Sequence, residues 1–234
     1  MNRLPTVGVA AIFKNEKPYV VEWLAHHRLL GVERFFIADN DSDDGTAELL
    51  QSLAACGFLT CHHLPSPVGT GAQLSAYRML MREHGHEVDW LAFIDADEFI
   101  WPMGEERCLP AFVQGLAQRH PDMGALVLNW AAYGSSGQLH QKPGLVVERF
   151  TWHAQQDHFV NVPIKSVVRP SEDEIIAALG DFHDQGFENV LLMTPQGRPL
   201  AQADLRRWAR EHDALVLEDG RLVEVVAAEV GQWL

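Results

Sequence analysis

Cysteines, basic residues and long hydrophobic runs are all scarce in this sequence. The three cysteines of the 234 residues, Cys56, Cys61 and Cys108, show no Cys-x-x-Cys spacing. This excludes a disulfide framework and favours a reducing compartment, so we expect a cytoplasmic protein. The apolar stretch before Lys14 is too short for the core of a signal peptide or for a membrane span. We therefore expect no integral membrane segment.

Basic residues are outnumbered by acidic ones. The chain has 18 Lys and Arg against 32 Asp and Glu, a net charge of -14 with neutral histidines. General affinity for nucleic-acid phosphates or an anionic membrane is therefore not expected. A phosphate-bearing ligand would need a local device, such as a metal ion or a helix N-terminus. Because hydrophobic residues make up 47% and charged residues 21%, the chain has the composition of a soluble folded domain.

Apolar runs alternate with helical patterns through the first hundred residues. Glycine- or proline-containing turns separate these segments, and Gly31 is the expected end of the first helix. The pattern predicts an α/β fold with a mainly parallel sheet covered by helices on both faces. The expected strands are 7–13, 34–38, 58–63 and 90–94, and the expected helices begin near 18, pass through 49–53, and span 72–84.

The second part of the sequence has a different pattern. After an expected helix at 109–119, the strands at 125–130, 145–150 and 164–168 are joined by segments too short for parallel crossovers, so we expect them to be antiparallel or edge additions. A capping box, Ser171 and Glu174, opens a further helix. A strand at 189–193, a helix at 203–211 and a hairpin around 218–220 follow. We expect a core domain at 1–170 and a small C-terminal appendage at 171–234.

The strongest local motif is Asp95-Ala96-Asp97, directly after an apolar strand. In open α/β sheets, ligands bind outside the carboxyl ends of the strands. Two carboxylates there would repel a diphosphate unless a divalent cation intervened, and oxygen ligands suit Mn²⁺ or Mg²⁺. The motif therefore predicts a metal-bound nucleotide, with a solvated acidic turn as the alternative.

A second polar segment follows the strand at 34–38. Asp39 stands where it could accept hydrogen bonds from a nucleobase or ribose, whereas Asp43, Asp44 and Thr46 suit the start of the next helix. Capping explains these later residues but does not require Asp39. The run 61–63, Cys-His-His, is a poor candidate for one zinc site because adjacent residues on a strand point to opposite faces.

Several motifs in order carry a resemblance to a known group of enzymes. The sequence resembles glycosyltransferases of the GT-A fold, in particular family 2 and more closely its family-92-like branch, over residues 6–170. The resemblance implies a GT-A (Rossmann-like) fold, a nucleotide-sugar donor, a divalent cation held by the Asp-x-Asp, transfer to a hydroxyl of a glycan or other acceptor, and contact of Asp39 with the base. The motifs are 13–16 (Phe-Lys-Asn-Glu), Glu22-Trp23 with His27, 30–32, 38–46, 95–99, Trp130 with 133–137, 147–150 and 164–170.

The site residues expected on this basis fall into three groups. An inverting transfer needs one general base, for which Glu148 is the first candidate and Asp157 the second. An ion pair of Glu148 with Arg149 or Lys165 is the structural alternative. His183 is a possible third metal ligand beside Asp95 and Asp97. Donor-binding residues are expected to be Asn15, Glu16, Asp39, Asn40, Asp95, Lys165 and Arg169.

The C-terminal 64 residues depart from the glycosyltransferase pattern. Residues 188–217 resemble a stretch of bacterial tRNA (guanine-N1)-methyltransferases, and 214–228 resemble part of urease nickel metallochaperones. Each fragment is too short to supply a function, so we expect a packing appendage. Two alternatives to a glycosyltransferase stay open. One is a nucleotidyltransferase, although no glycine-rich basic loop follows the first strand; the other is a nucleotide-binding module without turnover.

Overall fold

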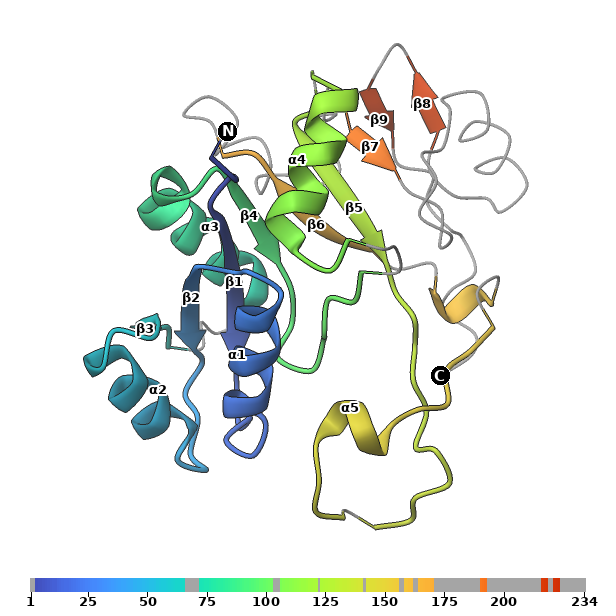
Figure 1. Ribbon diagram of the computed structural model, residues 1–234. Coiled ribbons are helices and arrows are strands. Elements are labelled where there is room, and N and C mark those ends of the chain that lie inside the picture. Colours follow the sequence, from blue (N-terminus) through green and yellow to red (C-terminus); the bar gives the residue numbers. More distant parts are fainter. Residues whose placement is uncertain are drawn as a thin grey trace.

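A seven-stranded sheet forms the centre of the computed structural model (Figure 1). The structure describes residues 3–65, 72–102, 106–121, 123–140, 142–155, 158–161 and 164–170, and the short strands 190–192, 216–218 and 221–223. The strand order is β3-β2-β1-β4-β6-β5-β7. These strands are β1 (Val7–Phe13), β2 (Arg34–Asp39), β3 (Thr60–His63), β4 (Trp90–Phe93), β5 (Ala125–Asn129), β6 (Ile164–Val168) and β7 (Val190–Leu192).

Helices lie between the strands along the chain. The described helices are α1 (Val20–Leu29), α2 (Thr46–Ala55), α3 (Ala72–His84), η1 (Gly85–Glu87), α4 (Leu109–Arg119), α5 (Val146–Arg149) and η2 (Phe159–Asn161). A separate antiparallel pair, β8 (Val216–Glu218) and β9 (Arg221–Val223), is the hairpin expected around 218–220. No helix in the described part of the chain is long and apolar enough to cross a bilayer.

The direction of the strands fixes where a ligand can bind. β1 pairs in parallel with β2 and β4, and β2 pairs in parallel with β3. The chain first moves from β1 outward to β2 and β3 and then returns to the other side of β1 at β4, so the strand order reverses between β1 and β4. Such a switch point opens a crevice at the carboxyl ends of the strands. β6 runs antiparallel to β4 and β5, as expected for an addition to the parallel half.

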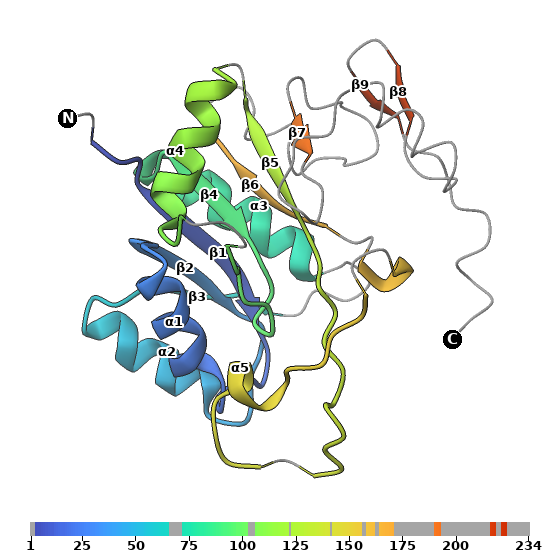
Figure 2. The ribbon, with the colours of Figure 1, turned by 45° about the vertical axis from the view of Figure 1, so that its right-hand side comes forward.

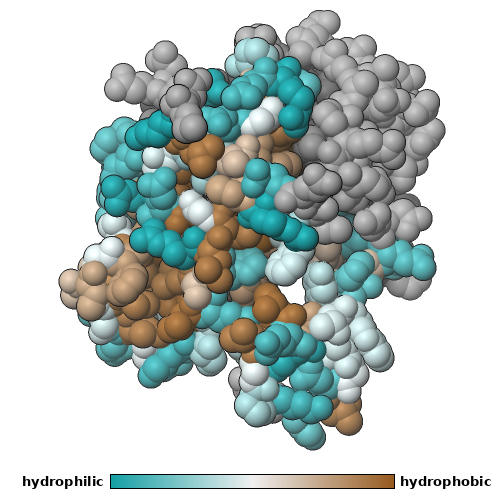
Figure 3. All heavy atoms as spheres, viewed as in Figure 1, coloured by the Kyte–Doolittle hydropathy of each residue, from teal (hydrophilic) through white to brown (hydrophobic). Residues whose placement is uncertain are grey.

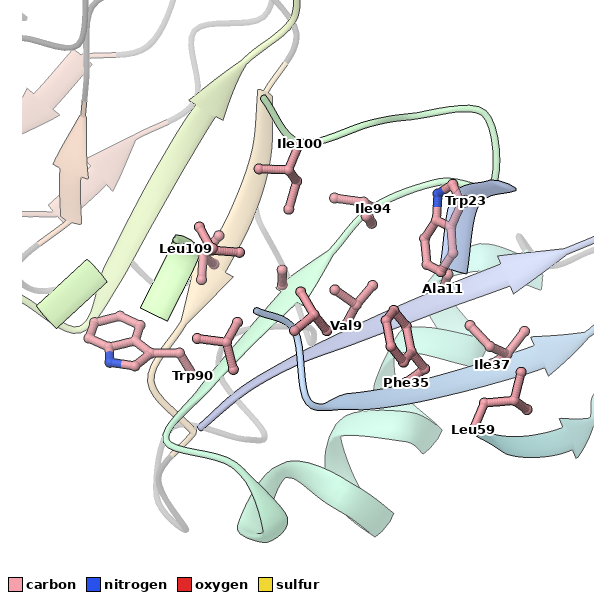
Figure 4. Packing of buried hydrophobic residues seen from close by; sticks show 14 of the residues in the cluster. Val9, Ala11, Trp23, Phe35, Ile37, Leu59, Trp90, Ile94, Ile100 and Leu109 are labelled. Carbon is pink, nitrogen blue, oxygen red and sulfur yellow. The ribbon is translucent and has the colours of Figure 1, made fainter. Parts of the chain in front are cut away.

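Helices cover both faces of the sheet, which confirms the predicted α/β fold (Figure 2). The larger core cluster joins one face to α1, α2 and α4, and it includes Leu50 of α2. Figure 4 shows Trp23 and Leu109 among its side chains. The smaller cluster joins the opposite face to α3, with Leu80 packed near Phe36. Burial of these apolar side chains supplies the main favourable term for folding.

Not all apolar side chains enter the core. Val21 and Leu29 on α1 expose 59% and 88% of their surface. Figure 3 shows hydrophobic surface over α1 and α2 on this side of the molecule.

Gly31, with a φ of +94°, lets the chain turn directly after α1 as expected.

One predicted element has the wrong type. Residues 145–150 were expected to be a strand, but Val146–Arg149 is the short helix α5. Its first amides are held by the carboxylate of Glu22 on α1, where Val146 N donates to Oε2 at 2.8 Å and Val147 N donates to Oε1 at 3.1 Å. The deciding interaction comes from more than a hundred residues away, so the alternating apolar pattern alone could not show it.

The C-terminal appendage contributes to the sheet. β7, expected at 189–193, pairs in parallel with β5 at its outer edge. The helices expected after Ser171 and at 203–211 lie outside the described residues.

Candidate functional site

The switch point gathers acidic residues from three strands. Glu16 follows β1, Asp39 ends β2, and Asp95 and Asp97 follow β4. All three strands run in the same direction, so their carboxyl ends lie along one edge of the sheet. The structure therefore brings together the two acidic segments that the sequence analysis singled out.

Asp95 is held by side chains from three other elements. Its Oδ1 accepts hydrogen bonds from the Tyr77 hydroxyl at 2.8 Å and from the Gln73 amide, both on α3. Its Oδ2 accepts a charge-assisted bond from Lys165 Nζ on β6 at 2.6 Å. The indole of Trp23 donates to the Asp95 backbone carbonyl at 3.1 Å. With three side-chain donors, Asp95 has little capacity left for a metal ion.

Lys165 also lies 3.3 Å from Oε2 of Glu98, so it bridges two carboxylates. Burial opposes the charge on Lys165, but its hydrogen bond and attraction to Asp95 and Glu98 outweigh that effect and raise its pKa. Burial raises the pKa of Glu98, although the Asp95 amide and Lys165 act in the opposite direction. The sequence analysis expected Lys165 to bind the donor. In this structure its ammonium group forms ion pairs with Asp95 and Glu98.

Asp97 is the free member of the Asp-x-Asp. It is exposed, and it makes no hydrogen bond or salt bridge within the described residues. The pKa of Glu16 is raised by burial and then by the negative charges of Asp97 and Asp44. This mutual repulsion of carboxylates is the environment that a hard divalent cation relieves. Carboxylate oxygens suit Mn²⁺ or Mg²⁺, so Asp97 and Glu16 are the candidate ligands for such a cation.

Asp39 carries an unsatisfied buried atom. The residue is 3% exposed, and Oδ1 has no hydrogen-bond partner in the described part of the chain. Oδ2 accepts a long bond from Ser42 N at 3.4 Å and lies 3.8 Å from Nδ1 of His63. Burying a carboxylate oxygen without a donor is costly, so this atom points to a ligand that supplies one.

Two other expected donor-binding residues make structural contacts. Asn15, at a φ of +61°, accepts from Asp43 N at 2.9 Å through Oδ1, and its own N–H donates to Ser42 Oγ at 3.0 Å. Asn40 is buried and donates from Nδ2 to the Leu64 carbonyl at 3.0 Å. The Asn15 bonds hold the loop after β1 against the loop after β2, whereas the Asn40 bond ties the end of β2 to the residue after β3.

The turn before α2 behaves as expected for local capping. Asp44 Oδ1 accepts from the Thr46 amide at 2.9 Å and from its hydroxyl at 2.5 Å. The side-chain bond from Thr46 lowers the pKa of Asp44. Thr46 Oγ1 in turn accepts from Glu16 N at 2.9 Å, which adds a link between the two loops.

Helix α1 holds three segments around the site. Glu22 binds the start of α5, Trp23 binds the Asp95 carbonyl, and His27 receives Ile100 N at 3.2 Å on Nε2. Nδ1 of His27 bonds the Trp23 carbonyl at 2.9 Å. Burial lowers the pKa of His27 to about 3, so its ring is neutral with one nitrogen donating and the other accepting.

Other predicted residues do not join this group. Arg169 lies over the Trp90 ring, 4.9 Å from its centroid. Because β6 is antiparallel to β4, the end of β6 lies beside the start of β4, at the edge opposite Asp95. Glu148 is exposed on α5, and neither salt bridge of Lys165 involves it. Asp157 and His183 lie outside the described residues.

The sequence analysis did not select Gln73, Tyr77 or Glu98. Gln73 and Tyr77 are four residues apart on α3 and so share one face of that helix. Glu98 follows the Asp-x-Asp directly and accepts from Asp95 N at 2.9 Å. The helical spacing was visible in the sequence, but the partner of that face was not.

Comparison with known proteins identifies the family. Residues 5–176 match glycosyltransferase family 92. The chain belongs to glycosyltransferase family 92. A family 92 protein of Arabidopsis thaliana is 30% identical over 135 residues, 55% of this chain and 23% of that protein. One from Oryza sativa is 28% identical over 180 residues, 75% of this chain and 29% of that protein. The chain thus spans less than a third of the length of these two relatives.

A further match concerns a different class of protein. A tRNA (guanine-N1)-methyltransferase of Synechococcus is 53% identical over 51 residues, 22% of this chain and 20% of that enzyme. A fragment of this length agrees with the short resemblance noted in the sequence.

Two solved structures illustrate what this family 92 chain is similar to. A mannosyltransferase from Pyrobaculum calidifontis in complex with GDP-Man and Mn²⁺ is 23% identical over 53% of this chain and 35% of its own, with a TM-score of 0.41. TarS of S. aureus is 12% identical over 91% of this chain and 40% of its own, with a TM-score of 0.49. The strand order and its switch point agree with the Rossmann-like GT-A fold that the resemblance implies.

Proposed function

We propose that this chain transfers a sugar from a nucleotide-sugar donor to a hydroxyl of a glycan or other acceptor. Family 92 membership supports glycosyl transfer. The observation that carries the donor assignment is the buried, unpartnered Oδ1 of Asp39 at the same sheet edge as Asp97. A nucleoside offers the hydroxyl or N–H donor that Oδ1 lacks, and its diphosphate would extend toward the acidic group after β4.

The acidic residues have separate roles in this proposal. Asp97, with Glu16 beside it, would hold Mn²⁺ or Mg²⁺, and the cation supplies positive charge to the diphosphate as it leaves. Asp95 positions the loop, because Lys165, Tyr77 and Gln73 already bind its carboxylate. Lys165 compensates the charges of Asp95 and Glu98 rather than the charge of the donor.

The acceptor hydroxyl must lose a proton during transfer. We propose Glu148 as the residue that takes it, in a single displacement that inverts the sugar. Glu148 is an exposed carboxylate on α5, the helix that Glu22 ties to α1 next to the site. An exposed carboxylate is available to a proton donor, unlike Asp95.

Donor turnover tests the proposal. The chain is incubated with UDP-, GDP- and dTDP-sugars, each with Mn²⁺ and with chelator, and nucleotide and sugar release are followed with candidate glycan acceptors. We expect nucleoside diphosphate release from one donor class, lost with chelator and in Asp97→Asn. Glu33→Gln, an exposed carboxylate that precedes β2 at the opposite edge, is the matched charge control and should retain turnover.

The alternatives give different outcomes. Pyrophosphate release from a nucleoside triphosphate and a sugar phosphate would indicate a nucleotidyltransferase. Tight nucleotide binding without product, across all donors and acceptors, would indicate a binding module. Turnover in Asp97→Asn, or in wild type with chelator, that equals the turnover of wild type with Mn²⁺ would contradict the metal assignment.

A further inference from the structure

A second group of ligating side chains lies away from the switch point. His62 on β3 and Glu83 and His84 on α3 offer ligand atoms that all lie within 4.8 Å of one another. β3 is the edge strand, whereas Asp95 and Asp97 follow β4 on the other side of β1. Strand alternation places Cys61 against the larger core cluster and turns His62 toward α3. The partners of His62 therefore come from α3 and not from the adjacent residues.

The two imidazoles face each other through the same ring nitrogen. Nε2 of His62 lies 2.7 Å from Nε2 of His84. On the far side of each ring, Nδ1 faces a carboxylate, with His84 Nδ1 at 2.6 Å from Glu87 Oε1 and His62 Nδ1 at 3.6 Å from Glu83 Oε2. An ionised carboxylate only accepts, so Nδ1 of His84 carries its hydrogen and Nε2 of His84 presents a lone pair toward His62. In the metal-free protein Nε2 of His62 can donate to that lone pair, and loss of this one hydrogen would leave both Nε2 atoms free to bind a cation.

Neighbouring side chains hold the His84 ring in place. His84 is 13% exposed and stacks on Phe36, with ring centroids 4.5 Å apart and planes 6° apart. This apolar contact fixes the ring that would act as a ligand. A carboxylate on the far nitrogen is also the usual arrangement around metal-bound histidines.

We propose that His62 and His84 bind Zn²⁺ through their Nε2 atoms, with Glu83 and Glu87 orienting the rings and water completing the coordination. In tetrahedral geometry with Zn–N bonds near 2.0–2.1 Å, two ligand nitrogens lie about 3.3 Å apart. The rings would therefore separate by about half an ångström from their 2.7 Å spacing.

This zinc would fasten β3 to α3. His63, next to His62, lies beside Asp39, and α3 carries Tyr77, which holds Asp95. The bound ion would thus fix two elements that position the site, at a place separate from the catalytic cation. It does not depend on the identity of the sugar donor.

Zinc titration of the chelator-treated, dialysed chain tests the proposal. We expect one Zn²⁺ per chain by calorimetry, a rise in melting temperature with Zn²⁺, and a visible Co²⁺ spectrum of tetrahedral intensity. The His62→Gln, His84→Gln double variant should lose at least a hundredfold in affinity and the zinc-dependent rise. His140→Gln, an exposed histidine in another loop, is the matched control and should bind like the wild type. Asp97→Asn should keep this zinc, which separates it from the switch-point cation.

A second variant covers the case in which the double variant does not fold. Glu87→Gln leaves both ligating rings in place but weakens the acceptor for His84 Nδ1, so it should bind Zn²⁺ about tenfold to a hundredfold more weakly. Unchanged zinc affinity in Glu87→Gln, equal affinity in a folded double variant, or no zinc uptake by the wild type would each overturn the proposal.

Discussion

Asp39→Asn should raise or preserve the stability of the chain while weakening nucleotide binding. In the free protein, Oδ1 of Asp39 is buried and has no hydrogen-bond donor among the described residues. The other carboxylate oxygen, Oδ2, makes only a long hydrogen bond to Ser42 N and a 3.8 Å contact with His63 within that part of the chain. A buried atom such as Oδ1 costs about 1–3 kcal/mol, and more when charged. Asparagine keeps a polar group at this position but removes the charge, so the additional cost that comes from the charge disappears. For a chain of this size, about 2–4 °C in melting temperature corresponds to each kcal/mol, so we expect an increase of a few degrees.

Binding should change in the opposite direction. Loss of a charged acceptor for a nucleoside donor costs about 1.5–3 kcal/mol, which is about tenfold to a hundredfold in affinity. Calorimetric titration with UDP, GDP and dTDP and a thermal melt measure the two effects on the same samples.

The adjacent Asn40→Ala serves as the contrast. Asn40 is buried and donates a hydrogen bond to the Leu64 carbonyl. Removing the Asn40 amide should therefore destabilise the fold by about 1–3 kcal/mol. An Asp39→Asn protein that melts well below the wild type yet binds nucleotide normally would refute the reasoning, because Asp39 would then serve the fold and not the ligand.

Two further predictions concern groups around the site. Lys165→Met leaves Asp95 and Glu98 without the cation they share, which should destabilise the fold by about 1–3 kcal/mol. Lys165→Arg keeps the positive charge and should retain most of the stability. Equal melting temperatures of wild type and Lys165→Met would contradict the ion pairing. His27 has a folded pKa of about 3 against 6.5 for the free side chain, so the unfolded chain binds a proton that the folded chain does not. The contribution of His27 to the free energy of unfolding is therefore fully present above pH 6.5. It decreases as the pH falls toward 3, by at most about 1.4 kcal/mol per pH unit. Denaturant melts across this range should show the stability difference between wild type and His27→Gln shrinking with acid, and parallel curves would contradict the assignment.

Much of the fold was predictable because its signals are local. The helix at 109–119 begins and ends where the pattern placed it; β1, β3 and β4 lie within their expected runs, and β2 extends one residue beyond its run to Asp39. The position of Asp95 and Asp97 at a strand's carboxyl end follows from one apolar run and one acidic turn. Since parallel strands share a direction, the gathering of Glu16, Asp39 and Asp97 also follows.

The contacts that decide the chemistry are not local. Lys165 reaches Asp95 across 70 residues, and Glu22 fixes α5 across 124. Arg169 was expected near the donor, but the antiparallel direction of β6 carries it to the other edge. Hydrophobic periodicity reports which face of an element is buried and not which side chain it meets there.

Helix α1 acts as a common reference for three loops. Glu22, Trp23 and His27 form hydrogen bonds with α5, the Asp-x-Asp turn and the segment at Ile100. If α1 tilted as a rigid body, these three segments would move together. Their distances from the strands would then change while the distances among them stayed the same. Transplanting any one loop into a related enzyme would accordingly require its α1 partner as well. The same linkage would make substitutions in the buried face of α1 disturb α5, the Asp-x-Asp turn and the segment at Ile100 at once.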